Sequence, residues 1–254
     1  MTGNAVGTGV PLIGVLGSLT VSVRGRPVVP TASRLRTMLA VLALAAGEPV
    51  PIGRLAAAVW GDDPPQDVRR TTQVYVARLR RLLGAELIRT VPAGYALMVE
   101  PDNVDARLFV RLVDAAARAT EPDTERALLV AALALWRGDP FQDARSAWLD
   151  RVEAPRLVDR RLAALERRIE LDLADPSPAL VAELQGLTAR YPLRERFWGQ
   201  LMTALHRAGR QGEALAAYQR LYRLLTEELG IEPGPAVRAV HRRVLGQATV
   251  GGPR

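Results

Sequence analysis

Five arginines lie in the 17-residue run 68–84, and no aspartate or glutamate accompanies them. A guanidinium group can donate two hydrogen bonds to the edge of a guanine, or it can neutralise a phosphate. Gln73 adds an amide suited to adenine, while Val74 and Ala77 are small apolar residues that can contact the methyl group of thymine. These residue types, close together, are those with which proteins hold and read double-stranded DNA.

As a helix, this run is amphipathic when its residues are placed about 100° apart around the axis. The side predicted to face a core comprises Val68, Thr72, Val76, Leu79, Leu82 and Leu83, with Tyr75 at its edge. The side predicted to face outward comprises Arg70, Gln73, Val74, Ala77, Arg78 and Arg81. Asp67 precedes the run and is a suitable N-cap. Taken alone, the pattern favours an ordinary surface helix with a solvated basic side, so the neighbouring segments decide the interpretation.

Those neighbours predict a winged helix. Residues 87–99 alternate like two short strands around a Pro-Ala-Gly turn. Upstream, 12–29 is predicted to form short strands, 35–46 an apolar helix that ends at Gly47, and 52–60 a second helix. A basic third helix followed at once by a small hairpin is the arrangement that places a helix in the major groove. The 68–84 helix is therefore interpreted as the recognition helix.

The charge distribution supports a polyanionic partner. The chain has 254 residues and a net charge of +7, of which +5 falls within residues 1–100 and +2 within 101–254. Most of the front excess lies in the basic helix, and nucleic acid is the natural partner for such a segment. All basic residues are arginine, so arginine preference by itself is not evidence of paired base contacts.

Catalysis, metal binding and membrane insertion are not expected. The chain has no cysteine and only two histidines, His206 and His241, around which no catalytic or metal-binding set can be assembled. We therefore predict a protein without enzymatic activity, cofactor or metal. No stretch of 18 uncharged apolar residues and no signal peptide is present, which predicts a cytoplasmic protein without a membrane partner.

Beyond a predicted junction at 98–104, the pattern becomes purely helical. The predicted helices are 105–119, 123–137, 145–174, 178–190, 194–208, 212–229 and 234–246. One stretch has near-tetratricopeptide spacing, carried by Trp198, Leu201, Leu205, Ala214, Tyr218 and Leu221. The predicted fold is mostly α, with an N-terminal α/β winged helix of the response-regulator output type and an all-α tetratricopeptide-like domain. The predicted parts are a flexible start (1–10), the winged helix (11–100), the helical domain (101–247) and a flexible tail (248–254).

Several stretches in this order resemble one family of bacterial regulators. They are Leu55 to Pro65 (LAAAVWGDDPP), Thr72 to Gly84 (TQVYVARLRRLLG), Ile88 to Leu97 (IRTVPAGYAL), Ala134 to Pro140 (ALWRGDP), Pro192 to Glu195 (PLRE), Leu201 to Leu215 (LMTALHRAGRQGEAL) and Glu228 to Pro235 (ELGIEPGP). Over roughly residues 12–246 the chain is similar to the SARP-type antibiotic regulatory proteins of actinobacteria. These activators join a winged helix to a bacterial transcriptional activator domain.

The resemblance implies a transcriptional activator that binds direct repeats in promoters of secondary-metabolite gene clusters and recruits RNA polymerase holoenzyme, as a dimer or as tandem protomers. DNA contacts implied by the family's pattern fall on Arg70, Val74, Tyr75, Arg78, Arg80 and Thr90. Further DNA-contact candidates, argued from residue type and position, are Gln73, Arg81, Arg89, Arg34 and Arg36. Two departures stand out: Pro92-Ala93 occupies the wing tip where relatives often have arginine, and Arg34-Leu35-Arg36 lacks the usual glutamine.

Two other functions are compatible with the residues. The chain could be a helical-repeat adaptor whose basic helix docks an acidic protein; such an adaptor would show no optimum in DNA sequence. It could also be a ligand-sensing regulator whose helix pairs hold a small molecule, although no residue pattern specifies the ligand.

Overall fold

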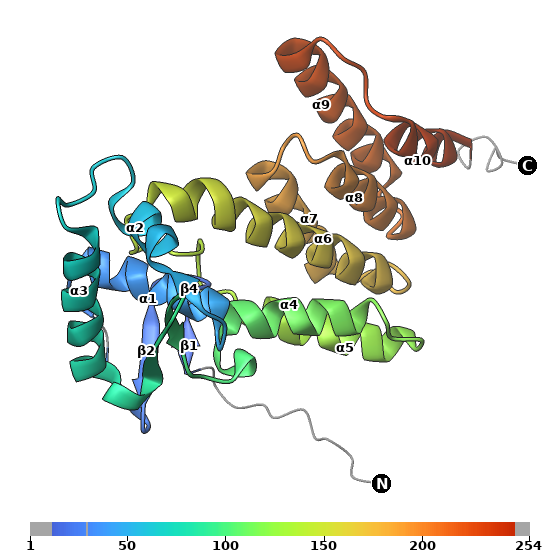
Figure 1. The fold of residues 1–254 in the computed structure, drawn as a ribbon. Coiled ribbons are helices and arrows are strands. Elements are labelled where there is room, and N and C mark those ends of the chain that lie inside the picture. Colours follow the sequence, from blue (N-terminus) through green and yellow to red (C-terminus); the bar gives the residue numbers. More distant parts are fainter. Residues whose placement is uncertain (1–11, 29, 247–254) are drawn as a thin grey trace, which may run out of the picture. The chain divides into compact units, whose positions relative to one another are not determined.

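The computed structural model describes residues 12–28 and 30–246 (Figure 1). The predicted flexible ends, 1–10 and 248–254, lie outside the described residues. The chain divides into two compact units, the first ending at Ala164 and the second beginning at Leu165. The first unit thus extends past the predicted winged-helix boundary at residue 100 and includes the start of the helical part.

Two small antiparallel sheets and three helices form the winged helix. One sheet has the strand order β1-β2-β3 and the other the order β4-β6-β5. The strands are β1 (Ile13–Gly14), β2 (Thr20–Val23), β3 (Arg26–Pro27), β4 (Val50–Pro51), β5 (Ile88–Val91) and β6 (Gly94–Leu97). The helices are α1 (Ser33–Ala45), α2 (Ile52–Trp60) and α3 (Val68–Leu83), with the 3-10 turns η1 (Ala85–Leu87) and η2 (Pro101–Asn103).

The remaining elements are helical. The first unit contains α4 (Asp105–Ala116), α5 (Pro122–Leu133) and the π-helical turn η3 (Leu149–Glu153), and the boundary between units falls within α6 (Ala154–Asp172). The second unit contains α7 (Pro178–Arg190), α8 (Glu195–Arg207), α9 (Gln211–Leu229) and α10 (Pro235–Gly246). Here α8 packs against α7, α9 and α10, and the small Ala214 of α9 is fully buried.

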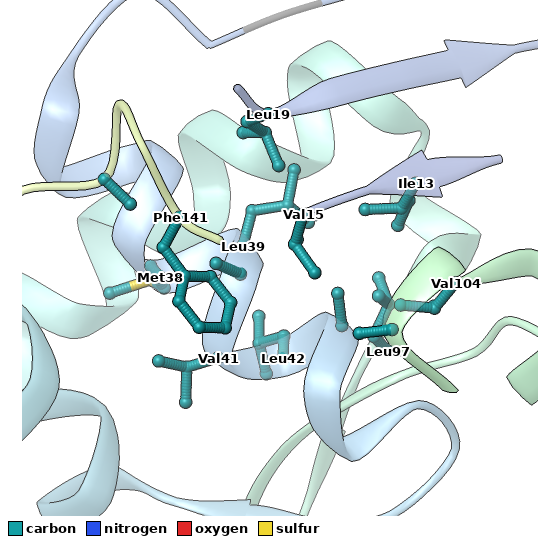
Figure 2. Packing of buried hydrophobic residues seen from close by; sticks show 14 of the residues in the cluster. Ile13, Val15, Leu19, Met38, Leu39, Val41, Leu42, Leu97, Val104 and Phe141 are labelled. Carbon is teal, nitrogen blue, oxygen red and sulfur yellow. The ribbon is translucent and has the colours of Figure 1, made fainter. Parts of the chain in front are cut away.

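Helix α1 is central to the core of the first unit (Figure 2). Met38, Leu39 and Leu42 are completely buried, because α1 carries apolar residues around most of its circumference. Figure 2 shows side chains from distant segments gathered around it, among them Ile13, Val15, Leu19, Leu97, Val104 and Phe141. A single core therefore includes the winged helix, the start of α4 and the loop after α5.

Main-chain hydrogen bonds hold that loop against the segment that follows β1. Arg137 donates its main-chain N–H to the carbonyl oxygen of Leu16 over 2.8 Å, and Phe141 donates to Val15 over 2.9 Å. The Asp143 carboxylate in turn accepts a 2.8 Å bond from the N–H of Leu19. The recognition helix is thereby carried on a unit larger than the winged helix alone.

The predicted fold class is confirmed, and the bounds of the 52–60 and 178–190 helices agree with α2 and α7. Some predictions were wrong in detail. The helix predicted over 123–137 ends at Leu133, and the helix predicted to begin at 145 includes a π-helical turn at Leu149–Glu153 before α6. The two-residue strand β4 was not predicted, because only its pairing with β6 defines it.

Candidate nucleic-acid interface

The recognition helix α3 has defined ends and one buried side. Asp67 accepts a 2.8 Å hydrogen bond from the main-chain N–H of Arg70, which confirms the predicted N-cap. Gly84 ends the helix at a positive φ of 112°, a backbone conformation that favours glycine. The fully buried residues of this helix are Thr72, Val76, Leu79 and Leu83. They anchor α3 so that its opposite side faces outward.

That outward side carries the predicted DNA-contacting groups. Its exposed residues are Arg70, Gln73, Val74, Ala77, Arg78 and Arg81, and Arg69 at the edge is exposed too. Within the described residues, no carboxylate pairs with Arg70, Arg78 or Arg81, so their charges remain available. Val74 is 45% exposed, which is unusual for a valine and suits an apolar contact with a base. We call these exposed α3 residues the arginine face.

Aromatic packing determines the position of Tyr75. Its ring meets that of Trp60 edge to face, with 5.8 Å between the ring centroids and 89° between the planes. The Arg78 guanidinium lies 5.8 Å from the centroid of the Tyr75 ring, within reach of a cation–π interaction. Tyr75 is therefore half-buried and supports Arg78. Leu82, by contrast, was predicted to be buried and is 41% exposed, so that prediction was wrong.

The wing is a tight hairpin with a two-residue tip. Val91 pairs with Gly94, so that only Pro92 and Ala93 form the exposed turn. Arg89 and Thr90 on β5 are both exposed, and Arg89 has no carboxylate partner among the described side chains. The tip itself presents no basic side chain, so the cationic part of the wing is its strand.

Arg80 joins the recognition helix to the wing. Its Nε donates to the main-chain oxygen of Ile88 over 2.9 Å, and its Nη2 donates to Oγ1 of Thr90 over 2.8 Å. Both predicted contact residues are therefore engaged with each other. The arrangement makes them a positioning pair that fixes the angle between α3 and β5, and it leaves the rest of the guanidinium edge for a phosphate.

The two arginines at the start of α1 differ. Arg34 is exposed, with no carboxylate partner among the described residues. Arg36 is half-buried: its Nε donates to the carbonyl of Pro30 over 2.8 Å, and its Nη1 lies 3.6 Å from Asp143. The prediction grouped both as phosphate contacts. The structure instead places Arg36 in the contact between α1 and the loop after α5, so we leave it out of the interface.

Other kinds of site find little support. Among residues 12–28 and 30–246, no cluster of three or more histidine or acidic side chains is placed to hold a metal ion. Within the same residues, no helix combines the length and the apolar character needed to cross a membrane. The arginine face is thus the chemically distinctive surface of the first unit.

Comparison with known proteins agrees with this geometry. Residues 25–97 match the family described as "Transcriptional regulatory protein, C terminal", and residues 104–245 match the "Bacterial transcriptional activator domain". The regulatory protein DnrI of Streptomyces peucetius is 38% identical over 92% of this chain and 91% of its own length. The transcriptional regulator RedD of Streptomyces coelicolor is 39% identical over 86% of this chain and 66% of its own length.

A solved structure of Mycobacterium tuberculosis EmbR, in complex with a low-affinity phosphopeptide, has a TM-score of 0.86 and 33% sequence identity. The similarity covers 92% of this chain and 65% of EmbR. Both the order of the two matched domains and the near-complete overlap with DnrI lead to one family. The chain belongs to the SARP-type transcriptional activators.

Proposed function

We propose that this protein is a sequence-specific DNA-binding activator that controls a secondary-metabolite, antibiotic-type gene cluster in the cytoplasm. The observation that carries the proposal is the arginine face, an outward surface of α3 with no compensating carboxylate among the described residues. A surface of this kind attracts a polyanion, and the helix beneath it has the diameter that the major groove admits.

Different parts of the surface have different tasks in this proposal. Arg70, Arg78 and Arg81 face the groove, where guanidinium groups can donate to guanine edges, and Gln73 and Val74 contribute base contacts beside them. A second group holds the phosphate backbone: Tyr75, Arg80, Arg89, Thr90 and Arg34. The first group determines sequence preference and the second determines register and overall affinity.

The helical part places the DNA-bound protein next to its partners. We propose that the target is a direct repeat in a promoter, occupied by a dimer or by tandem protomers, and that the helical domain contacts RNA polymerase holoenzyme. DnrI and RedD, which are both named as regulators, support the promoter target. The match of residues 104–245 to the bacterial transcriptional activator domain supports the contact with polymerase.

The proposal is tested by footprinting the purified chain on the genomic DNA of its source, followed by titration of the recovered repeat. We expect tight binding to that repeat, weak binding to a scrambled duplex of the same composition, and a log–log salt slope near −0.9 per phosphate neutralised. Equal affinity for both duplexes would reject sequence-specific recognition and favour the adaptor function. Transcription from the footprinted promoter with purified holoenzyme tests activation separately.

A further inference from the structure

Two adjoining hollows lie in the second compact unit, among the end of α6, helix α8 and the start of α10. Their volumes are about 790 Å³ and about 440 Å³. Both are lined by Thr203, Arg207 and Val240, so the two spaces share a wall. The larger hollow has the size of sites that hold drug-sized molecules in proteins. We call the pair the α8–α10 pocket.

Much of the wall of the larger hollow is apolar. The apolar and small residues that line it are Leu173, Ala174, Gly199, Pro235, Ala236, Val237 and Val240. Gly199 and Ala236 add little volume, and this leaves room where larger side chains would fill the space between α8 and α10. Such a wall favours an apolar ligand body, because the transfer of apolar surface out of water stabilises the bound state.

The acidic residues at the pocket are already engaged. Glu195 accepts a 2.6 Å hydrogen bond from the main-chain N–H of Gly234, and Glu170 pairs with Arg196 over 2.8 Å. Among the described residues, Arg207 donates only to the main-chain oxygen of Leu173. Arg243 is exposed at the smaller hollow, and no described carboxylate pairs with it. Glu195 keeps its negative charge at the larger hollow, since a main-chain N–H does not neutralise it, but no carboxylate of the described residues lines the smaller hollow. The charge on the side of Arg207 and Arg243 is therefore positive, and an anionic group is its complement.

One wall residue also has an unsatisfied acceptor. Gln200 is only 7% exposed; its Nε2 donates to the main-chain oxygen of Glu166 over 2.7 Å. Its Oε1 is buried and has no hydrogen-bond donor among the described residues. A buried oxygen of this kind destabilises a structure, and the wall would have to shift before a ligand group could reach it.

We propose that the α8–α10 pocket binds a small amphipathic aromatic anion. The apolar body packs against the wall between α8 and α10, and the anionic group lies near Arg207 and Arg243. The site makes the protein responsive to a metabolite of this chemistry. The inference does not depend on the DNA-binding surface, because all lining residues belong to the second unit.

The test uses 8-anilinonaphthalene-1-sulfonate, which combines an aromatic body, a sulfonate and an N–H group. Fluorescence titration of the full chain is expected to show saturable binding of one probe per chain. Ala236→Trp fills the larger hollow from an exposed position and should abolish that binding. Its matched control, Ala216→Trp, replaces an exposed alanine of α9 that lines neither hollow and should leave binding unchanged.

A second pair of variants tests the charge. Arg243→Gln should weaken probe binding by about threefold, the effect of one partly solvated ion pair. Arg242→Gln, exposed on the same helix but outside both hollows, should have no effect. Circular dichroism checks that each variant is folded, and titration with the footprinted repeat checks that DNA binding is unchanged.

Three results would overturn the proposal. One is non-saturating fluorescence with the full chain, which would indicate unspecific adsorption. Another is probe binding that Ala236→Trp leaves intact. The third concerns the oligomeric state: the wild type sediments as a dimer, whereas Ala236→Trp sediments as a monomer and does not bind the probe. That result would make this groove a surface between two copies of the chain.

Discussion

The Arg137 guanidinium donates a 3.0 Å hydrogen bond to the carboxylate of Asp105, which is only 2% exposed and lies at the start of α4. The same carboxylate accepts hydrogen bonds from the main-chain N–H groups of Val15, at 2.7 Å, and Leu16, at 3.1 Å. One buried acid thus joins the segment just after β1 to the beginning of the helical part. It explains why the first compact unit continues past residue 100.

The first prediction concerns this buried acid. Asp105→Asn keeps the shape of the side chain but turns an amide N–H group toward other hydrogen-bond donors, the main chain of Val15 and Leu16 and the Arg137 guanidinium. It should therefore lower the free energy of unfolding by about 3 kcal/mol. Asp102→Asn is the matched control, because Asp102 pairs with Arg111 in an exposed ion pair. The control should change stability by less than about 1 kcal/mol. Urea unfolding measures both, and equal effects would contradict a structural role for Asp105.

The second prediction concerns Arg78 on the arginine face. Arg78→Ala should weaken binding to the footprinted repeat by about 1–3 kcal/mol and relax the preference at one base position, if it contacts a base edge. Arg118→Ala removes an exposed arginine that follows α4 and should leave affinity and preference unchanged. Gel-shift titrations against single-base variants of the repeat separate the outcomes. An unaltered preference in Arg78→Ala would remove that base contact.

The third prediction concerns the bond between Arg80 and Thr90. Thr90→Val deletes the acceptor without changing the shape, while Arg80→Ala also loses the bond to the main chain of Ile88. Both variants should be less stable than wild type, with Arg80→Ala affected more. The double variant should reveal a coupling energy of about 1 kcal/mol in thermal or urea unfolding. Strict additivity of the two single effects would show that the bond contributes nothing.

The fourth prediction concerns the close approach of β6 to β4. Gly94 has a φ of 150°, and a Cβ added there would collide with the carbonyl oxygen of Val50. Gly94→Ala should therefore destabilise the protein by about 1–3 kcal/mol and displace the wing. Gly53→Ala is the control, because Gly53 lies in α2 with open space around it and should gain stability. Thermal unfolding compares them, and a neutral Gly94→Ala would refute the predicted collision.

The fifth prediction concerns pH. The rings of His241 and Tyr218 are stacked, with centroids 3.7 Å apart, and burial lowers the pKa of His241. The unfolded state then binds a proton more readily, so the stabilisation is complete above the ordinary histidine pKa and is lost as the pH falls below it. His241→Gln should show a smaller loss of melting temperature between pH 7.5 and 5.5, values chosen around a histidine pKa of about 6.5. The same pH dependence in wild type and variant would contradict this assignment.

Periodicity predicted most of the helices, because each has one apolar side at a spacing that only a helix aligns. The core residues of α3 follow directly from that spacing, as Val76 and Leu79 show. Leu82 departs from it, since its position at the edge of the apolar side left it half outside the core. The strand β4 had no local signal, because two residues become a strand only when β6 lies beside them.

The sequence by itself determined the order of the elements, the outward row of arginines on 68–84 and the family resemblance, since these depend on residue type and on spacing within one segment. Only the tertiary structure decided which guanidinium groups are held by hydrogen bonds to other segments. Arg36 and Arg80 have the same side chain as Arg78, yet they bond to Pro30, Ile88 and Thr90 while Arg78 remains on the outward face. Hydrogen bonds from a helix to the segments next to it depend on how the chain folds back on itself, and residue spacing along one helix carries no information about them.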